Sequence, residues 1–320
     1  MDPVEALNPA SCYVPSPTCA TFINAVRHGP VNEMRVLILR SARGEGKTSA
    51  GLWACMALAE RLAAEHPEAL PLRVAVVRDF WVNLERTTLP TFEENARLGV
   101  ELEWLNGRRE AVIASGGIPF VHFWFFGVDR PDDADKFQGF QSGVLWLEEV
   151  APAAGVASGV PASVFGTGAL AVRQSHVPPR VIITMNPPDK NHWILRVEEH
   201  LAGLGLRDVV VSHFVIPSGE RSVHFRALAA MGEGEAWNEA ADAFDAYRTR
   251  NRAFLEAVGR HDLVARLVEG EIGEVRLGTA VVPNFSRALH VAKEPLAIVR
   301  GLEVIRGIDA GINDLHPACC

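Results

Sequence analysis

Cysteine is scarce in this chain of 320 residues, and its spacing fits no structural framework. The five cysteines form an odd set in which no pair has the spacing of a zinc site. We therefore expect no disulfide framework and no structural metal held by thiolates. The simplest interpretation is small, partly buried thiols in a reducing compartment.

Long apolar runs are missing as well. The sequence contains no uncharged apolar stretch of about 18 residues, the length that a membrane-spanning helix needs. Residues 1–5 do not begin a basic region followed by an apolar run, which is the pattern of a secretory leader. We therefore expect neither a signal peptide nor a membrane partner.

Positive charge is in deficit. Lysine and arginine number 31 against 39 aspartates and glutamates, for a formal net charge of −8. A protein that coats nucleic acid without sequence preference is basic, so any grip on DNA must come from a local patch. The content of 48% hydrophobic and 22% charged residues is that of a folded globular protein, which excludes disorder of the whole chain.

Apolar runs and helical periodicity alternate along the first two thirds of the chain. This alternation predicts an α/β fold with a mainly parallel sheet and helices on both faces. The predicted strands cover residues 34–39, 72–77, 143–147 and 180–184, with short β segments within 101–126, and the predicted helices cover residues 47–65 and 82–97.

The chain divides into four expected regions. The first is a lead-in segment with a short helix at residues 21–27, and the last begins with a strand at residues 303–308 that looks like the opening of a different domain. We expect the lead-in at 1–30, the α/β core at 31–195, a lid or linker at 196–300 that is helical at 235–268, and the start of another domain at 301–320.

A candidate phosphate loop joins the first predicted strand to the helix at 47–65. Its residues are Ser41, Ala42, Arg43, Gly44, Glu45, Gly46, Lys47 and Thr48. Small residues let backbone amides turn toward phosphate oxygens, and the following helix N-terminus adds a favourable dipole. In this interpretation Lys47 reaches the β and γ phosphates and Thr48 binds Mg²⁺. The alternative is a turn that matches the pattern by chance.

Three positions of this loop call for comment. Ser41 stands where the usual pattern begins with glycine. Arg43 is interpreted either as a sensor of the γ-phosphate or as a solvated loop side chain. A carboxylate beside a triphosphate is unfavourable, so we expect Glu45 to point to solvent.

Two acids follow a buried strand at its carboxyl end. Residues 144–147 are apolar, and Glu148 and Glu149 come directly after them. Ligands of open α/β sheets bind at that edge. Glu148 is expected to hold Mg²⁺, through water, and Glu149 to polarise the attacking water as general base. The alternative is a solvated pair of acids.

A third polar segment follows the strand at 180–184. Thr184 and Asn186 stand at its end, before two prolines that stiffen the exit. Either side chain is placed to contact the γ-phosphate or the attacking water. Loss of the phosphate would then be transmitted to a neighbouring subdomain.

The order of these pieces resembles the large terminase subunit of tailed bacteriophages, in the branch with Trp-x-Glu-Glu. The resemblance runs from about residue 12 to the end. It rests on the phosphate loop with its inner Arg43, Val77-Arg78 at the end of the next strand, residues 146–149, Thr184-Met185-Asn186-Pro187-Pro188 and His192-Trp193.

The resemblance implies a P-loop NTPase fold of the ASCE or RecA-like class. It also implies a motor that uses ATP and Mg²⁺ to translocate double-stranded DNA into a procapsid. Lys47, Arg43 and Glu149 become the catalytic residues, Glu148 and Thr48 the metal side, and Thr184 and Asn186 the coupling motif.

The resemblance further implies partners and a setting. These are double-stranded DNA, the portal protein of the procapsid, the small terminase subunit and a homo-oligomeric ring, in the cytoplasm of an infected bacterial host. A neighbouring subunit would supply a cation to the site. The candidates for that cation are Lys136, Arg130 and Arg173.

The family's second domain is a nuclease with an RNase H-like fold. Residues 307–311 match its opening Gly-x-Asp-x-Gly strand, and residues 316–318 carry the Pro-Ala step. Asp309 would be the first metal-binding carboxylate. Two-metal nucleases need further carboxylates from later strands, and the sequence ends at Cys320. We therefore expect no nuclease activity from this chain alone.

Two alternatives stand beside the packaging motor. A helicase-like translocase, also a nucleic-acid-stimulated ATPase, would need a second RecA-like unit, and residues 200–300 show no second set of alternating strands. A nucleotide-binding scaffold that does not turn over would have no need for the general base Glu149.

Overall fold

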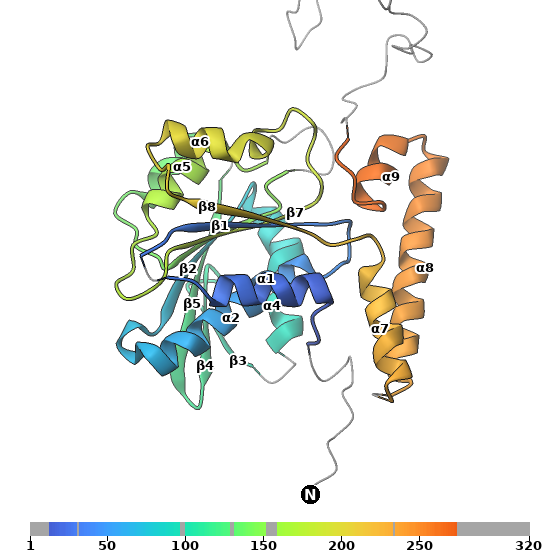
Figure 1. Ribbon diagram of the computed structural model, residues 1–320, viewed down its shortest axis with the longest axis horizontal. Helices are drawn as coiled ribbons and strands as arrows, with labels where there is room; N and C mark the ends of the chain where they lie inside the picture. The colour runs from blue at the N-terminus through green and yellow to red at the C-terminus, as the bar shows by residue number, and fades with distance from the viewer. Residues whose placement is uncertain are drawn as a thin grey trace, which may run out of the picture. The chain divides into compact units, whose positions relative to one another are not determined.

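Helices and strands alternate along the chain in a computed structural model, which describes residues 13–30, 32–96, 100–128, 131–151, 159–232 and 234–273 (Figure 1). The strands are β1 (Arg35–Arg40), β2 (Leu72–Arg78), β3 (Glu101–Leu105), β4 (Glu110–Ser115), β5 (Ile118–Gly127), β6 (Val144–Glu148), β7 (Arg180–Met185) and β8 (Val210–Val215). The longer helices are α1 (Pro17–Arg27), α2 (Lys47–Glu65), α4 (Leu89–Ala96), α5 (Ala162–Leu170), α6 (Val197–Gly203), α7 (Glu220–Ala230), α8 (Ala236–Ala257) and α9 (His261–Leu267). The short helical segments are η1 (Pro67–Ala69), α3 (Trp81–Asn83), η2 (Leu84–Thr88), η3 (Pro131–Phe137) and η4 (Trp193–Arg196).

The strands of the described residues form one eight-stranded sheet with the order β3-β4-β5-β2-β6-β7-β1-β8. Every pairing from β5 to β8 is parallel, whereas β4 is antiparallel to both β5 and β3. The predicted α/β class with a mainly parallel sheet is confirmed. The antiparallel hairpin accounts for the short β segments expected within 101–126.

Both faces of the sheet are covered, as parallel sheets require. Alternate residues of each central strand enter opposite cores: Leu37 and Leu39 of β1 pack with α1 and α2, whereas Val36 and Ile38 pack with α5 and α6. Figure 1 shows these two helical layers on either side of the sheet. The burial of nearly every residue of β1, β6 and β7 explains their continuous apolar sequences.

The parallel arrangement brings the predicted site residues to one edge. Because β1, β6 and β7 are neighbours and run in the same direction, their carboxyl ends lie together. The phosphate loop follows β1, Glu149 follows β6 and Asn186 follows β7. The α2 helix then runs from this edge over the face that it shares with α1.

Two segments differ from the sequence-based expectation. The strand β8 lies inside region 196–300, which we expected to be a lid without core strands, yet it pairs with β1 and extends the sheet past residue 195. Its residues are partly exposed and include Ser212 and His213, so it lacks the apolar run that marked the central strands. The first helix begins at Pro17 rather than residue 21, since proline is well suited to a first helical position.

Other expectations concern single features. Cys19 and Cys55 are free and buried, in agreement with the interpretation as thiols. Among the described residues, no helix is both long and apolar enough to cross a membrane. Asp309, the strand expected at 303–308 and the candidate cation Arg130 lie outside the described residues.

Candidate functional site

The phosphate loop makes a tight turn between β1 and α2. Gly44 and Gly46 adopt left-handed φ angles of 83° and 90°, which favour glycine. The α2 helix begins at Lys47, and Gly46 is its N-cap, so no side chain there competes for the first amides of the helix. These amides and the helix dipole provide a site suited to an anion.

Lys47 is directed into the protein, with only 6% of its surface exposed. Its Nζ donates to Ala42 O at 2.9 Å, to Ser41 Oγ at 3.2 Å and to Asn186 Oδ1 at 3.1 Å. Burial lowers the pKa of this ammonium, while the nearby Glu149 and Glu148 oppose that effect. Lys47 is therefore held beneath the loop and bonded to Asn186, which follows β7, the neighbour of β1 in the sheet.

Glu148 ends β6 as a buried carboxylate surrounded by hydroxyl donors. Thr48 Oγ1 donates to its Oε1 at 2.6 Å, and the hydroxyl of Thr184 donates to Oε2. The indole of Trp146 in turn donates to Thr184 Oγ1 at 2.7 Å. Burial, followed by repulsion from Glu149, raises the pKa of Glu148.

Glu149 is the first residue beyond the strand and has a left-handed φ of 52°. Its Oε2 accepts from Asn186 Nδ2 at 2.7 Å and from Asn186 N at 3.3 Å. The Asn186 amide therefore binds Lys47 through its oxygen and Glu149 through its nitrogen. A positive φ at a non-glycine residue costs free energy, and such residues cluster at functional sites.

The α2 helix is shaped to admit Trp146. A Cβ atom on Gly51 would lie 2.4 Å from the indole, so no larger residue fits at that position of the helix. Glycine inside a helix is unfavourable by about 1 kcal/mol relative to alanine. That cost is offset by burial of Trp146, whose indole holds Thr184 against Glu148.

The donor set fits Mg²⁺ and a nucleotide. Thr48 and Glu148 present hydroxyl and carboxylate oxygens, the ligand types that Mg²⁺ prefers, at the base of the phosphate loop. A carboxylate that is 1% exposed and adjacent to a second acid also gains from a nearby cation. A Cβ atom on Gly46 would meet no atom within 4 Å, so the space beside the loop is open.

Glu45 contradicts its expected orientation. We expected this loop carboxylate to point to solvent, but it is 1% exposed. Its oxygens accept from the backbone amides of Gly219 at 2.6 Å and Arg221 at 3.2 Å. Glu45 therefore caps the N-terminus of α7, where a carboxylate interacts favourably with unpaired amides and the helix dipole.

The helices after β8 contact the phosphate loop at further points. Arg43 N donates to Leu267 O at 2.8 Å, and the exposed Arg43 side chain borders a cavity of about 150 Å³ beside α8. A Cβ atom on Gly44 would lie 2.7 Å from the ring of Phe244. The loop is thus held between the sheet and helices α7, α8 and α9.

Arg266 of α9 is a site residue that the sequence reasoning missed. It is fully buried, and its Nε donates to Pro187 O at 2.8 Å, directly after the Thr184–Asn186 segment. Lys190 N also donates to Gly273 O at 3.0 Å. Nothing in the local pattern of residues 261–267 distinguishes Arg266 from the other arginines of the chain, because its partners lie about eighty residues away.

The candidate trans-acting cations lie in different places. Lys136 follows β5, and its Nζ donates to Gly127 O at 2.9 Å, at the carboxyl end of that strand. Arg173 is exposed, and its backbone amide bonds to Ser142 O just before β6, at the opposite edge. Only Lys136, of these two, lies at the edge that carries the phosphate loop.

The sheet order and the tight turn from β1 into α2 agree with the predicted α/β fold with a mainly parallel sheet. No protein-family model matches the sequence, and no curated protein is a significant match to it. Solved structures of similar fold include three large terminases of bacteriophages, each under 20% identical to this chain. The chain spans less than half the length of one of them, from a thermophilic bacteriophage.

The likeness to each structure is modest. For the large terminase from this thermophilic bacteriophage the TM-score is 0.43 at 16% identity, over 63% of this chain and 46% of that one. For the Thermus phage P74-26 large terminase ATPase domain the TM-score is 0.45 at 13% identity, over 83% of this chain and 100% of that domain. For the HK97 bacteriophage large terminase the TM-score is 0.44 at 14% identity, over 81% of this chain and 51% of that one. A function for this chain must therefore rest on the site geometry and the sequence motifs.

Proposed function

We propose that this chain is the ATPase motor subunit of a phage-type large terminase, which couples ATP hydrolysis to movement of double-stranded DNA into a procapsid. One observation carries the proposal: Asn186 bridges the phosphate-loop lysine and the acid after β6. A protein that only binds nucleotide has no need to connect a phosphate-binding group to a general base.

Each polar group of the site has a role in hydrolysis. Lys47 and the amides of residues 44–48 bind the β and γ phosphates, and Arg43 extends the loop toward the nucleotide. Thr48 and Glu148 hold Mg²⁺, which neutralises charge on the phosphates when bound. Glu149 orients and deprotonates the attacking water.

Asn186 is the point where nucleotide state is read. Its side-chain amide binds Lys47 through Oδ1 and Glu149 through Nδ2 at the same time. When Lys47 turns to a phosphate, Asn186 Oδ1 loses that partner, while Asn186 Nδ2 keeps Glu149 in position to bind water. Thr184 links the same strand to Glu148, so metal and phosphate act on β7 together.

The signal then leaves β7 through its following segment. Pro187 accepts the hydrogen bond of Arg266, and Lys190 bonds to Gly273. The phosphate loop contacts the same helices through Glu45, Gly44 and Arg43. Displacement of either element is therefore passed to α7, α8 and α9.

The proposal includes partners. DNA is gripped through its phosphates by local lysines and arginines, so the grip weakens as salt rises. A ring of identical subunits brings a cation from one chain to the phosphates of the next, with Lys136, Arg130 and Arg173 as candidates. The portal protein and small terminase subunit complete the assembly.

The test is phosphate release from ATP with Mg²⁺ at high protein concentration, with and without linear double-stranded DNA. We expect DNA to stimulate turnover and Glu149→Gln to reduce it by about 10²- to 10⁴-fold. Glu198→Gln is the matched control, because Glu198 is an exposed acid paired with His213 outside the site.

Other outcomes separate the alternatives. Wild-type turnover by the Glu149→Gln protein contradicts the assignment of the base. Nucleotide binding without turnover, even with DNA, favours the scaffold. Separation of the strands of a forked duplex favours the helicase-like translocase over the packaging motor.

A further inference from the structure

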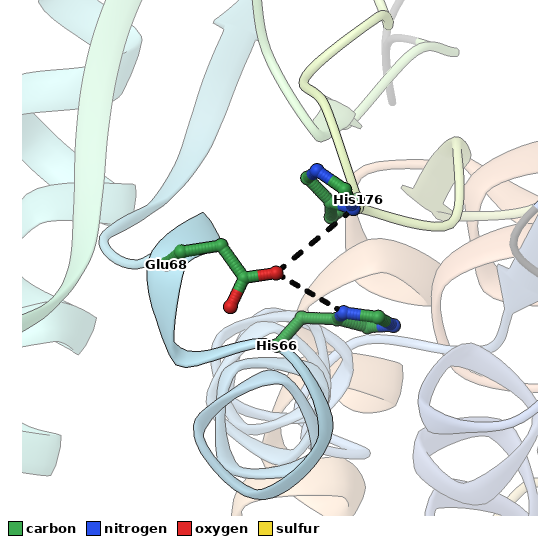
Figure 2. A group of neighbouring side chains, drawn as sticks. All are labelled: His66, Glu68 and His176. Carbon is green, nitrogen blue, oxygen red and sulfur yellow. Dashed lines mark hydrogen bonds and ion pairs between the residues drawn. The ribbon is translucent and has the colours of Figure 1, made fainter.

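A second cluster of ligand-bearing side chains lies at the edge of the sheet opposite the phosphate loop. His66 directly follows α2, Glu68 belongs to η1, and His176 lies in the turn before β7. Because β2 begins shortly after η1 and runs parallel to its neighbours, these residues stand at the amino ends of the strands. Figure 2 shows one carboxylate oxygen of Glu68 directed toward both imidazole rings.

The spacing of the ligand atoms suits a small metal ion. Glu68 Oε1 lies 3.3 Å from His66 Nδ1 and 3.9 Å from His176 Nδ1. Zinc bonds of about 2.0–2.1 Å at tetrahedral angles place ligand atoms about 3.4 Å apart. The first of these two contacts already has this length, and the second needs to shorten by about half an ångström. All three ligand atoms lie within 4.8 Å of one another, so modest rotations of exposed side chains bring them to the distances of a zinc site.

The chemistry of the three groups selects the metal. Two imidazoles and one carboxylate favour zinc and similar first-row ions over Mg²⁺ or Ca²⁺, which take oxygen ligands. In the part of the chain that the structure describes, this is the one group of three such side chains whose ligand atoms converge.

We propose that His66, Glu68 and His176 form a binding site for one zinc-type divalent transition-metal ion. All three side chains are partly exposed, so water takes the remaining coordination position. The ion joins the far ends of two elements whose near ends belong to the nucleotide site: α2, which begins at Lys47, and β7, which leads to Asn186. This proposal is independent of the ATPase assignment.

The test uses the full chain without an affinity tag, stripped of metal with chelator and titrated with zinc chloride. The readouts are zinc bound at equilibrium and the thermal midpoint with and without zinc, since an ion that binds only the folded state raises the midpoint. Glu68→Gln keeps the size of the ligand but removes its charge. His176→Asn suits the left-handed φ of 61° at that position, so the turn is preserved.

The matched control is His213→Asn. His213 Nε2 lies 3.3 Å from Glu198 Oε1, the same distance as between His66 Nδ1 and Glu68 Oε1. Among the described residues, His213 and Glu198 belong to no group of three whose ligand atoms converge. We expect Glu68→Gln and His176→Asn to weaken one zinc site at least about tenfold and to abolish the zinc-dependent rise in midpoint. His213→Asn should bind as the parent does.

The parent, the ligand variants and the control variant share the same cysteines, so any zinc bound by thiolates contributes equally to each measurement and does not affect the difference between them. Circular dichroism in chelator checks that each variant folds, and His66→Gln provides a third variant if one does not. Zinc binding equal to that of the parent in the folded ligand variants overturns the proposal. The cluster is then a hydrogen-bonded surface group only.

Discussion

The phosphate loop has two sides that do different work. On the inner side, Lys47 and Thr48 bond to side chains at the ends of β6 and β7. On the outer side, Glu45 and Gly44 contact helices α7 and α8. The inner contacts join groups that carry chemistry, whereas the outer contacts are a helix cap and a close packing contact.

Under the proposed function, this difference separates the residues that act in catalysis from those that pass on movement. Loop residues that alternate in direction would then allow one short segment both to bind phosphate and to hold the neighbouring helices. Substitutions on the inner side should therefore change turnover, and substitutions on the outer side should change stability and the response to DNA. Three substitutions test this division, in order of expected size, and a fourth tests the charge of the inner acid Glu148.

Lys47→Ala should give the largest effect. It removes the cation that approaches the phosphates, and loss of one such electrostatic contact costs about 10²- to 10³-fold in turnover. Steady-state phosphate release measures it. Arg207→Ala is the control, because Arg207 is an exposed cation outside both the loop and the segment that follows β7. Equal losses in both proteins would contradict the inner-side assignment.

Asn186→Ala should reduce turnover by about 10- to 100-fold, since Glu149 loses the group that positions it. Nucleotide binding should change far less, because Lys47 keeps its own contact with phosphate. Comparing the ATPase rate with binding of a fluorescent nucleotide separates the two effects. A variant that loses affinity and rate in equal measure would show that Asn186 acts on binding alone.

Glu45→Gln should act through the outer side. Burial raises the pKa of Glu45, so loss of its charge is not the cost. The amide nitrogen of Gln cannot accept from the second capping amide of α7, and such caps contribute about 0.5–2 kcal/mol. The matched control is Glu220→Gln, which removes a carboxylate cap from Thr18 at the start of α1 without touching the loop. Both should lower the thermal midpoint, but only Glu45→Gln should also weaken stimulation by DNA. Unaltered stimulation in Glu45→Gln would break the comparison between the two sides.

Glu148→Gln should stabilise the metal-free protein by a few degrees at neutral pH. Burial and Glu149 raise the pKa of Glu148, so the folded state prefers the protonated form. That preference is fully satisfied below the ordinary glutamate pKa of about 4.3 and is lost as pH rises through the raised value. Each kcal/mol added to the free energy of unfolding raises the thermal midpoint by about 2–4 °C in a domain of 150–250 residues.

Thermal melts at several pH values check this prediction. The advantage of Glu148→Gln should vanish in acid, and Mg²⁺ with nucleotide should stabilise the parent more than the variant. A variant that is less stable than the parent at neutral pH would contradict the direction of the shift.

The sequence predicted the placement of those site residues that lie next to strong local patterns. The helix at 47–65 has the predicted bounds. Because the carboxyl ends of parallel strands lie at one edge of a sheet, the sequence also predicted that Lys47, Glu148 and Asn186 lie close together, as the hydrogen bonds among the site residues show. Their placement was predictable because a buried strand and a glycine-rich turn are each visible in a few consecutive residues.

What escaped prediction depends on contacts between distant segments. Glu45 was expected in solvent because a carboxylate beside a triphosphate is unfavourable. Its actual partners, the amides of α7, are about 175 residues away along the chain and leave no local signal. Arg266 carries no local mark, and β8 is a partly exposed edge strand without an apolar run. A buried charge or an edge strand is defined by its partner, and no neighbouring residue identifies that partner.

Trp146 should allow the proposed metal site to be followed by fluorescence. Its buried indole donates to the Thr184 hydroxyl, which donates in turn to Glu148. Indole emission responds to its hydrogen bond and to nearby charge, so a cation arriving at Glu148 should alter the fluorescence of this one residue. The difference between the parent and Trp146→Phe isolates its signal from the other six tryptophans. Under the proposed function, the protein therefore reports the steps of its nucleotide cycle through an intrinsic fluorophore.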